Sequence, residues 1–214
     1  MIRIVIADDH TIMREGLKQL LTAAGDFEIV AEARDGHEAL QRVRELDFDV
    51  LLLDMSMPGK GGLEVIKQAR AEKPRLRILV LSMHEEHQYA IRAIKSGASG
   101  YLTKEAASTQ LASALRKVAG GGAYITPEVA EHLALGAMPS SAAEPHTTLS
   151  DREFQVLRLL ADGAGVSDIA GRLNLSVKTV STHKARLMQK LGVDTTAALI
   201  RYALEHRLTD PGSL

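Results

Sequence analysis

The sequence predicts two folded domains, a doubly wound α/β domain followed by a small all-helical domain. The chain has 214 residues, and domains commonly have about 100 to 150 residues. Over the first 120 residues, short β-branched segments alternate with helical patterns, as they do in parallel βαβ units. Every periodic segment after residue 147 is helical. These observations predict a five-stranded parallel sheet of the flavodoxin-like type, and then a domain built from helices alone.

The first domain is expected to span residues 1–120. Each predicted strand is a short apolar run, and a helical pattern follows each one. The predicted strands are Arg3–Ala7, Glu28–Ala31, Val50–Leu53, Arg77–Leu81 and Gly100–Leu102. The predicted helices are Ile12–Ala23, Gly36–Leu46, Gly62–Glu72, Glu85–Ser96 and Ala107–Ala119. Strict alternation of five strands and five helices indicates a doubly wound sheet.

The second domain is expected to span residues 148–210, after a linker over 121–147. The linker contains a short helix, Pro127–Leu135, and then the stretch Gly136–Thr147, whose glycine, proline, serine and alanine content predicts flexibility. A capping box opens the helical domain, with Ser150 as the N-cap residue and Glu153 three residues later. The first helix should end near Asp162. Three further helices are predicted, Ser167–Leu173, Val177–Leu191 and Thr195–Arg207.

Composition excludes several classes of protein. The hydrophobic fraction of 45% and the charged fraction of 25% are ordinary for a globular domain. Because the chain has no cysteine, it has no disulfide, no thiolate metal site and no thiol nucleophile. The opening apolar segment, Met1–Ala7, is too short for a signal sequence or a membrane span. We therefore expect a cytoplasmic protein with no membrane partner.

Charged side chains are expected to converge where the strands of the first domain end, because ligands of parallel α/β sheets bind at the carboxyl ends of the strands. Asp8 and Asp9 follow the first strand, Asp54 the third, Ser82 the fourth and Lys104 the fifth. Three crowded carboxylates repel one another unless a hard divalent cation binds, and Mg²⁺ fits best. Asp54 is the predicted nucleophile that accepts a phosphoryl group as an acyl phosphate.

The remaining residues of this pocket have predicted supporting roles. Asp9 is expected to bind the metal directly, and Asp8 directly or through water. The backbone carbonyl of Ser56 would be a third protein contact to the metal. Lys104 is expected to pair with the phosphoryl oxygens, and the Ser82 hydroxyl to donate a hydrogen bond to one of them.

These motifs resemble the receiver domain of response regulators in order and spacing, over about 120 residues. They are Asp8-Asp9, the run Leu53–Pro58 with Gly62, Ser82, and the run Tyr101–Lys104. The resemblance implies that the phosphoryl donor is a sensor histidine kinase or a related phospho-histidine. It also implies that Ser82 and Tyr101 move together on phosphorylation. Receivers usually follow the lysine with a cis proline, whereas this chain has Glu105.

The second domain contains the pattern of a helix-turn-helix unit, in which a short helix and a tight turn precede a longer helix that enters the major groove. The segment Ser176–Leu191 carries four cations and no acid, which suits a polyanion. At about 100° per residue, one side of the longer helix is apolar. This predicted core stripe is Val177, Val180, Leu187, Met188 and Leu191. The residues predicted to contact DNA are Lys178, Thr179, Ser181, Thr182, His183, Ala185, Arg186 and Lys190.

The helical half resembles the LuxR-type DNA-binding domain, and the two halves together resemble a NarL/FixJ-type response regulator. The matching residues are Leu149–Glu153, Val156-Leu157, Gly163, Asp168–Ala170, Leu173, Ser176, Lys178–Val180, His183 and Lys190–Val193. The resemblance implies that phosphorylation of Asp54 controls sequence-specific binding to duplex DNA, and so transcription. It also implies a homodimer when the protein is phosphorylated.

Two alternatives belong to other classes of protein. A Mg²⁺-dependent phosphohydrolase of the haloacid dehalogenase type would carry Asp-x-Asp-x-Thr after the first strand, whereas here Asp9-His10-Thr11 follows Asp8. The second alternative is a module that binds DNA, RNA or a protein scaffold independently of phosphorylation. RNA binding would need aromatic side chains on which bases stack, but aromatics make up 3% of the chain. We expect no enzyme activity beyond self-phosphorylation and slow autodephosphorylation. His84 and His87 lack zincin spacing and are expected on an exposed face, with His10 in a loop.

Overall fold

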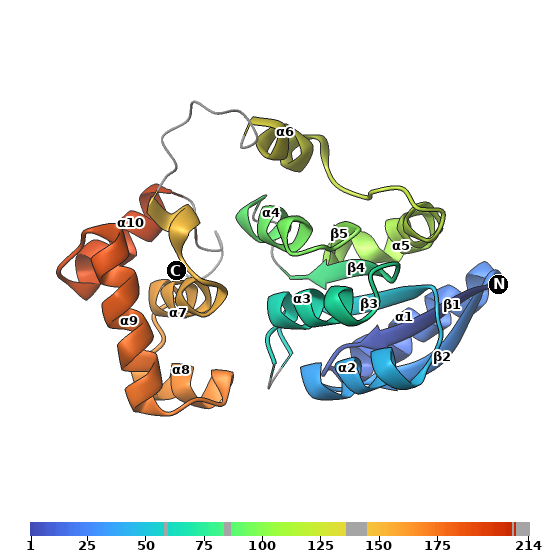
Figure 1. The fold of residues 1–214 in the computed structure, drawn as a ribbon, viewed down its shortest axis with the longest axis horizontal. Helices are drawn as coiled ribbons and strands as arrows, with labels where there is room; N and C mark the ends of the chain where they lie inside the picture. The colour runs from blue at the N-terminus through green and yellow to red at the C-terminus, as the bar shows by residue number, and fades with distance from the viewer. Residues whose placement is uncertain (58–59, 84–86, 136–144, 207, 209–214) are drawn as a thin grey trace. The chain divides into compact units, whose positions relative to one another are not determined.

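The computed structural model describes residues 1–57, 60–83, 87–135, 145–206 and 208 of the chain (Figure 1). The chain divides into two compact units, Met1–Leu133 and Ala134–Leu214. The second part of the loop after Asp54, including Pro58, lies outside the described residues, as does His84. None of the helices in the described ranges is long and apolar enough to span a membrane.

The first unit is built on a five-stranded parallel sheet with the strand order β2-β1-β3-β4-β5. The strands are β1 (Ile2–Ala7), β2 (Phe27–Ala33), β3 (Val50–Asp54), β4 (Arg77–Ser82) and β5 (Gly100–Thr103). The central strand β3 is buried along its whole length, because helices cover both faces of a doubly wound sheet. The predicted fold class of this domain is confirmed.

The helices of this unit are α1 (Thr11–Ala24), α2 (Gly36–Glu45), α3 (Gly62–Glu72), α4 (His87–Lys95) and α5 (Lys104–Ala119). Leucines and alanines of α1 and α5 pack in one core cluster with alternate residues of the strands, such as Ile4, Ile6 and Leu52. Helix α2 packs against α3, and α3 against α4. The predicted helices are confirmed, although α5 begins at Lys104 instead of Ala107. The Thr103 hydroxyl caps it by accepting a 3.3 Å hydrogen bond from the Ala106 N–H.

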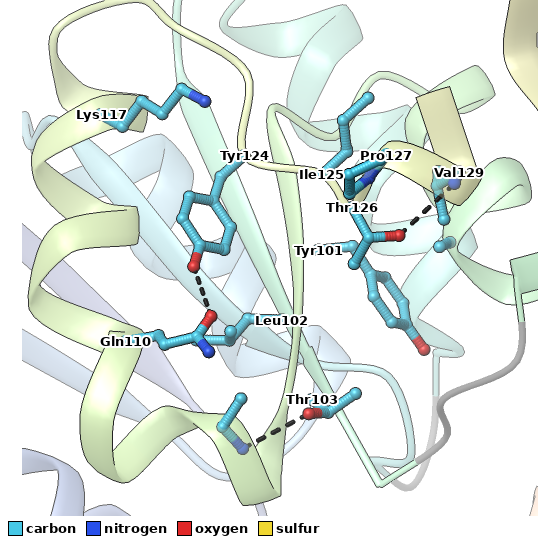
Figure 2. A pocket seen from close by; sticks show the side chains of 12 residues that line it. Tyr101, Leu102, Thr103, Gln110, Lys117, Tyr124, Ile125, Thr126, Pro127 and Val129 are labelled. Atoms are coloured by element: carbon cyan, nitrogen blue, oxygen red, sulfur yellow. Dashed lines mark hydrogen bonds between the residues drawn. The ribbon is translucent and has the colours of Figure 1, made fainter. Parts of the chain in front are cut away.

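The segment after α5 attaches to the edge of the sheet. The Tyr101 N–H donates to the Tyr124 carbonyl at 2.8 Å, and the Tyr124 N–H donates to the Ser99 carbonyl at 3.1 Å. The Tyr124 hydroxyl lies 2.6 Å from Oε1 of Gln110 on α5 (Figure 2). A cavity of about 520 Å³ remains between β5, α5 and the start of α6 (Pro127–Leu135). Tyr124, which was expected in the linker, therefore bonds directly to β5.

The second unit is helical, as predicted. Its elements are η1 (Pro145–Thr148), a 3-10 turn, and the helices α7 (Asp151–Ala161), α8 (Val166–Leu173), α9 (Val177–Leu191) and α10 (Thr196–Glu205). The capping box is present: Ser150 Oγ accepts from the Glu153 N–H at 3.3 Å, and Glu153 Oε2 accepts from the Ser150 N–H at 2.7 Å. Asn174, with φ of 52°, ends α8 in the left-handed conformation and makes the tight turn before α9.

Two sequence-based expectations about this unit need correction. The predicted flexible stretch Gly136–Thr147 reaches beyond the described residues over 136–144, but its last residues form η1, where the His146 side chain is buried. Val177 was predicted in the core stripe of α9 and is 51% exposed, and Met188 is only half-buried. A helical wheel gives the direction of a side chain but not how far along the helix the packing partners reach. Val180, Leu187 and Leu191 are buried as predicted.

Candidate functional site

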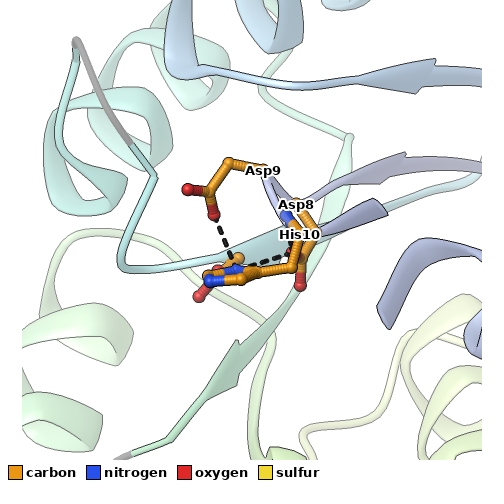
Figure 3. A group of neighbouring side chains, drawn as sticks. Asp8, Asp9 and His10 are labelled. Atoms are coloured by element: carbon orange, nitrogen blue, oxygen red, sulfur yellow. Dashed lines mark hydrogen bonds and ion pairs between the residues drawn. The ribbon is translucent and has the colours of Figure 1, made fainter. Parts of the chain in front are cut away.

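Three acidic side chains meet at the carboxyl ends of β1 and β3. Asp8 and Asp54 are each 1% exposed, and the side chain of Asp9 is 30% exposed. One carboxylate oxygen from each of them and a ring nitrogen of His10 all lie within 4.8 Å of one another. The His10 Nδ1 is 3.0 Å from Asp9 Oδ1 and 3.4 Å from Asp8 Oδ1 (Figure 3). The predicted convergence of the three carboxylates is therefore present.

Lys104 joins two of these carboxylates. Its Nζ lies 2.8 Å from Asp8 Oδ2 and 2.8 Å from Asp54 Oδ2, and its side chain is 4% exposed. Burial alone would lower the pKa of Lys104, but the charges of Asp54 and Asp8, and the hydrogen bonds to them, outweigh burial and raise it. The ammonium is therefore held in its charged form between two acids.

Asp54 is fixed at both carboxylate oxygens. Oδ2 accepts from Lys104, and Oδ1 accepts a 3.1 Å hydrogen bond from the Ser56 N–H. Burial raises the pKa of the Asp54 carboxyl, and Lys104 opposes that effect only in part. The start of α3 lies close against the loop after Asp54: a Cβ on Gly62 would lie 2.9 Å from the Met55 Cα. Because glycine has no Cβ, Gly62 allows this close approach.

The cluster suits a divalent cation. Three carboxylates and one ammonium carry formal charges of −3 and +1, which leaves −2 for a cation to neutralise. Asp9 Oδ1 is itself covered from solvent and accepts no hydrogen bond in the described part of the chain, although the His10 Nδ1 lies 3.0 Å from it. Crowded carboxylates, two of them buried, are stable when a metal or another cation pairs with them. The residues present are therefore compatible with metal binding.

Ser82 and Tyr101, the predicted phosphoryl-binding and switch residues, lie on the strands beside this cluster. Ser82 is fully buried at the end of β4, next to Leu81, which is paired with Asp54. Tyr101 is 7% exposed on β5. Its backbone N–H is the group that bonds to Tyr124, so β5 is attached to the segment that follows α5.

The outward face of α9 in the second unit is polar and exposed. The exposed members of the predicted DNA-binding set are Lys178, Ser181, Thr182, Ala185, Arg186 and Lys190, whereas Thr179 and His183 are half-buried. The hydroxyls of Ser181 and Thr182 each donate at 2.9 Å to a carbonyl one turn earlier in α9. Lys190 is occupied inside the domain, because its Nζ lies 2.7 Å from Glu153 Oε2.

Residues 4–116 match the family described as response regulator receiver domain, and residues 147–203 match the family described as bacterial regulatory proteins, luxR family. The chain is 40% identical over 97% of its length to the oxygen regulatory protein NreC of Staphylococcus carnosus, of which the match covers 99%. It is 35% identical to the response regulator GacA of Pseudomonas aeruginosa over the full length of both chains. The chain is a NarL/FixJ-type response regulator.

Solved structures similar to this response regulator include RcsB of Salmonella enterica serovar Typhimurium bound to promoter rprA in the presence of the phosphomimetic BeF3⁻. The TM-score is 0.66 and the identity 32%, over 94% of this chain and 98% of that one. A second RcsB structure, of two dimers bound to two parallel DNAs, gives a TM-score of 0.58 at 32% identity, over 95% of this chain and 98% of that one. The C-terminal domain of this response regulator is thus a LuxR-type DNA-binding domain.

Sequence reasoning missed two residues of the receiver site. His10 lies in a loop as expected, but the contact of its ring with Asp8 and Asp9 was not predicted. Arg14 is 4% exposed and donates from Nη1 to the Asp8 carbonyl at 2.7 Å. The sequence held a signal for Arg14, because it shares a helical face with the buried Leu17, three residues on.

Proposed function

We propose that Asp54 of this response regulator accepts a phosphoryl group from a sensor histidine kinase with Mg²⁺, and that phosphorylation controls binding of the protein to promoter DNA. The observation that supports Asp54 best is its place in the cluster. It is buried, it lies beside two further carboxylates, and Lys104 holds it through a 2.8 Å contact. A carboxylate with metal and ammonium groups beside it can attack phosphorus, because the cations absorb the charge of the phosphoryl oxygens.

In the proposed transfer, one Asp54 oxygen attacks the phosphorus of a phospho-histidine. The P–O bond forms as the P–N bond breaks, and the donor imidazole keeps the electron pair. Mg²⁺, held by Asp8, Asp9, Asp54 and the Ser56 carbonyl, would neutralise charge on the phosphoryl oxygens. Lys104 would turn from Asp8 to one phosphoryl oxygen and the Ser82 hydroxyl would donate to another, while Tyr101 moves with Ser82.

For the DNA-binding half, we propose that α9 enters the major groove and that the phosphorylated protein binds as a homodimer. The exposed, acid-free face of α9 supports the first statement. Two RcsB structures support the second by analogy, one bound to promoter DNA in the presence of a phosphomimetic and one of two dimers bound to two parallel DNAs. We also propose that the protein acts in the cytoplasm, where bacterial promoters lie. It would turn over no substrate other than its own phosphoryl group, which it loses slowly.

Intact-mass measurement after treatment with acetyl phosphate and Mg²⁺ tests the proposed site. We expect one acid-stable, alkali-labile phosphoryl group on the wild type and none on Asp54→Asn. Asp47→Asn is the matched control, because the Asp47 side chain is 97% exposed, pairs with Lys73 and does not belong to the acidic cluster; this variant should label normally. Equal labelling of the wild type and Asp54→Asn would overturn the assignment.

Coupling between the two halves is tested separately with fully phosphorylated protein. We expect phosphorylation to raise the affinity for DNA sites selected with the isolated C-terminal domain, and to shift the mass in solution toward that of a dimer. If DNA affinity, mass and hydrogen exchange are all unchanged, the protein binds DNA without regard to phosphorylation.

A further inference from the structure

We propose that Arg14 is a positioning residue for the metal site, which holds Asp8 in place through its backbone carbonyl while the Asp8 side chain changes partners. This inference rests on the proposed phosphoryl-transfer function. Arg14 lies one turn into α1, and its guanidinium reaches back under the loop that carries Asp8 and Asp9. It touches none of the oxygens proposed to bind the metal.

The contacts of Arg14 join three parts of the receiver. Nη1 donates to the Asp8 carbonyl at 2.7 Å, and Nε donates to Glu32 Oε2 on β2 at 3.0 Å. The other oxygen of Glu32 lies 2.8 Å from Nζ of Lys18, one turn further along α1. A planar guanidinium donates from several nitrogens in fixed directions, so it can bond the carbonyl and the carboxylate at the same time. The ammonium of a lysine is a point charge and lacks this fixed geometry.

The burial of Arg14 calls for a reason beyond packing. It occupies the buried face of α1 with Leu17 and Leu21, where an apolar side chain would bring no charge to desolvate. The pair with Glu32 is only partly buried, because the Glu32 side chain is 36% exposed, and such a pair contributes little net stability compared with an apolar side chain of the same volume. The guanidinium therefore has the properties of a group that positions the loop with Asp8 and Asp9. It is 4% exposed, Glu32 neutralises its charge, and it donates to the backbone of that loop.

Asp8 is held at four atoms, and two of them are its carboxylate oxygens. Its backbone N–H donates to the Ala33 carbonyl at 3.1 Å, and its backbone carbonyl accepts from Arg14. Oδ2 accepts from Lys104 at 2.8 Å, and Oδ1 accepts from the His10 N–H at 2.7 Å. Transfer of Lys104 to a phosphoryl oxygen would remove the first of them. The bond from Arg14 is made to the carbonyl and the bond to Ala33 from the N–H, so neither a metal nor a phosphoryl group competes for them. The Ala33 bond continues the pairing of β1 with β2, whereas the Arg14 bond joins the loop to α1, and Arg14 can therefore hold the loop against α1 in every state of the cycle.

Direct metal binding by the full-length protein tests this role. The probe is Mn²⁺ in place of Mg²⁺, with free Mn²⁺ measured by electron paramagnetic resonance. We expect Arg14→Met, which keeps the volume but removes both hydrogen bonds, to raise the Mn²⁺ dissociation constant about tenfold, as loss of supporting hydrogen bonds around metal ligands commonly does. Arg14→Lys should fall between the wild type and Arg14→Met. Far-UV circular dichroism and thermal unfolding report whether each variant is folded.

Arg44→Met is the matched control, because Arg44 makes a two-bond pair with Glu72 on the same domain, at 2.9 and 2.6 Å, away from the acidic cluster. It should leave the dissociation constant unchanged. Labelling by acetyl phosphate adds a second readout. A positioning defect raises the Mg²⁺ concentration needed for half-maximal labelling and leaves the maximal rate close to that of the wild type, whereas general damage lowers the maximal rate at all concentrations.

Three results would overturn the inference. They are an unchanged dissociation constant in folded Arg14→Met, an equal loss in Arg44→Met, and a lowered maximal rate with no change in the Mg²⁺ requirement. If Arg14→Met does not fold, Arg14→Lys decides in its place: a weakened Mn²⁺ affinity supports the role and an unchanged affinity overturns it. Failure of the wild type itself to label at Asp54 would instead overturn the proposed function.

Discussion

Lys190→Ala separates two roles that the sequence could not distinguish. The residue was predicted to contact a DNA phosphate, yet its Nζ lies 2.7 Å from Glu153 Oε2 and 3.3 Å from the Thr148 carbonyl. Glu153 is 3% exposed, and Oε2 also accepts the Ser150 N–H of the capping box. Removing Lys190 would therefore leave a buried carboxylate without its cation. We expect this change to lower the free energy of unfolding of the domain, and not only its affinity for DNA.

The size of the effect follows from the exposure of the pair. Removing one partner of a fully buried ion pair costs about 3 to 5 kcal/mol. Here the Lys190 side chain is 40% exposed, so solvent already screens the pair, and Glu153 keeps the bond from the Ser150 N–H. We therefore expect a loss of about 1 to 3 kcal/mol in the free energy of unfolding of this domain.

Hydrogen exchange measured by mass spectrometry on the full chain can check this value. The most protected amides of α7 and α9 should exchange roughly 5 to 150 times faster in Lys190→Ala, since about 1.4 kcal/mol corresponds to a factor of ten. Arg186→Ala is the control, because Arg186 is an exposed cation one turn earlier on α9, and its exchange should stay within about twofold of the wild type. Unchanged protection in Lys190→Ala, together with weaker DNA binding, would refute the reasoning and make Lys190 a simple phosphate contact.

Three further predictions follow from the same structure. Burial alone would raise the pKa of Glu153, but hydrogen bonds from Lys190 and Ser150 outweigh burial and hold this pKa below the usual 4.5. The ionised Glu153 therefore stabilises the folded domain above pH 4.5, and this contribution is lost as the pH falls through the lower pKa of the folded state. Hydrogen exchange measured against pH should show the loss in the wild type and not in Glu153→Gln. Gly62→Ala should slow acetyl phosphate labelling and lower the free energy of unfolding by about 1 to 3 kcal/mol, because the added Cβ would meet the backbone of the loop after Asp54. Gly16→Ala is the control: a Cβ there meets nothing within 4 Å, so this variant should be neutral or stabilising in thermal unfolding. Lys178→Ala should weaken binding to all duplexes and lower the salt dependence, while Thr182→Ala should cost about 1 to 3 kcal/mol at specific sites alone, as titrations of specific and scrambled duplexes across a salt series would show.

The sequence predicted most of the fold because its patterns are local. Apolar runs and helical periodicity located five strands and nearly all the described helices to within a few residues. The start of α5 was placed too late because a threonine N-cap, Thr103, is a weak signal beside the alanine-rich pattern that begins at Ala106. The attachment of Tyr124 to β5 could not be predicted, because backbone pairing between segments about 24 residues apart leaves no periodic pattern in either of them.

The site was predictable to the extent that its residues stand at strand ends. Asp8, Asp9, Asp54 and Lys104 meet there because parallel strands bring their carboxyl ends to one edge of the sheet. The ion pair of Lys190 could not be predicted for a different reason. A helical wheel places it on the flank of α9, but only the packing of α9 on α7 shows that a buried acid lies beneath it.

The pairing of Tyr124 with β5 also bears on how the protein avoids association through its sheet. β5 is an edge strand, and an edge with unpaired N–H and C=O groups is a template for β-strand addition by another chain. Tyr124 occupies two of those groups, the Tyr101 N–H and the Ser99 carbonyl. A receiver fragment that stopped at Gly120 would expose them. One that continues through Leu133 would keep these two groups paired and should stay monomeric to higher concentration in its unphosphorylated form.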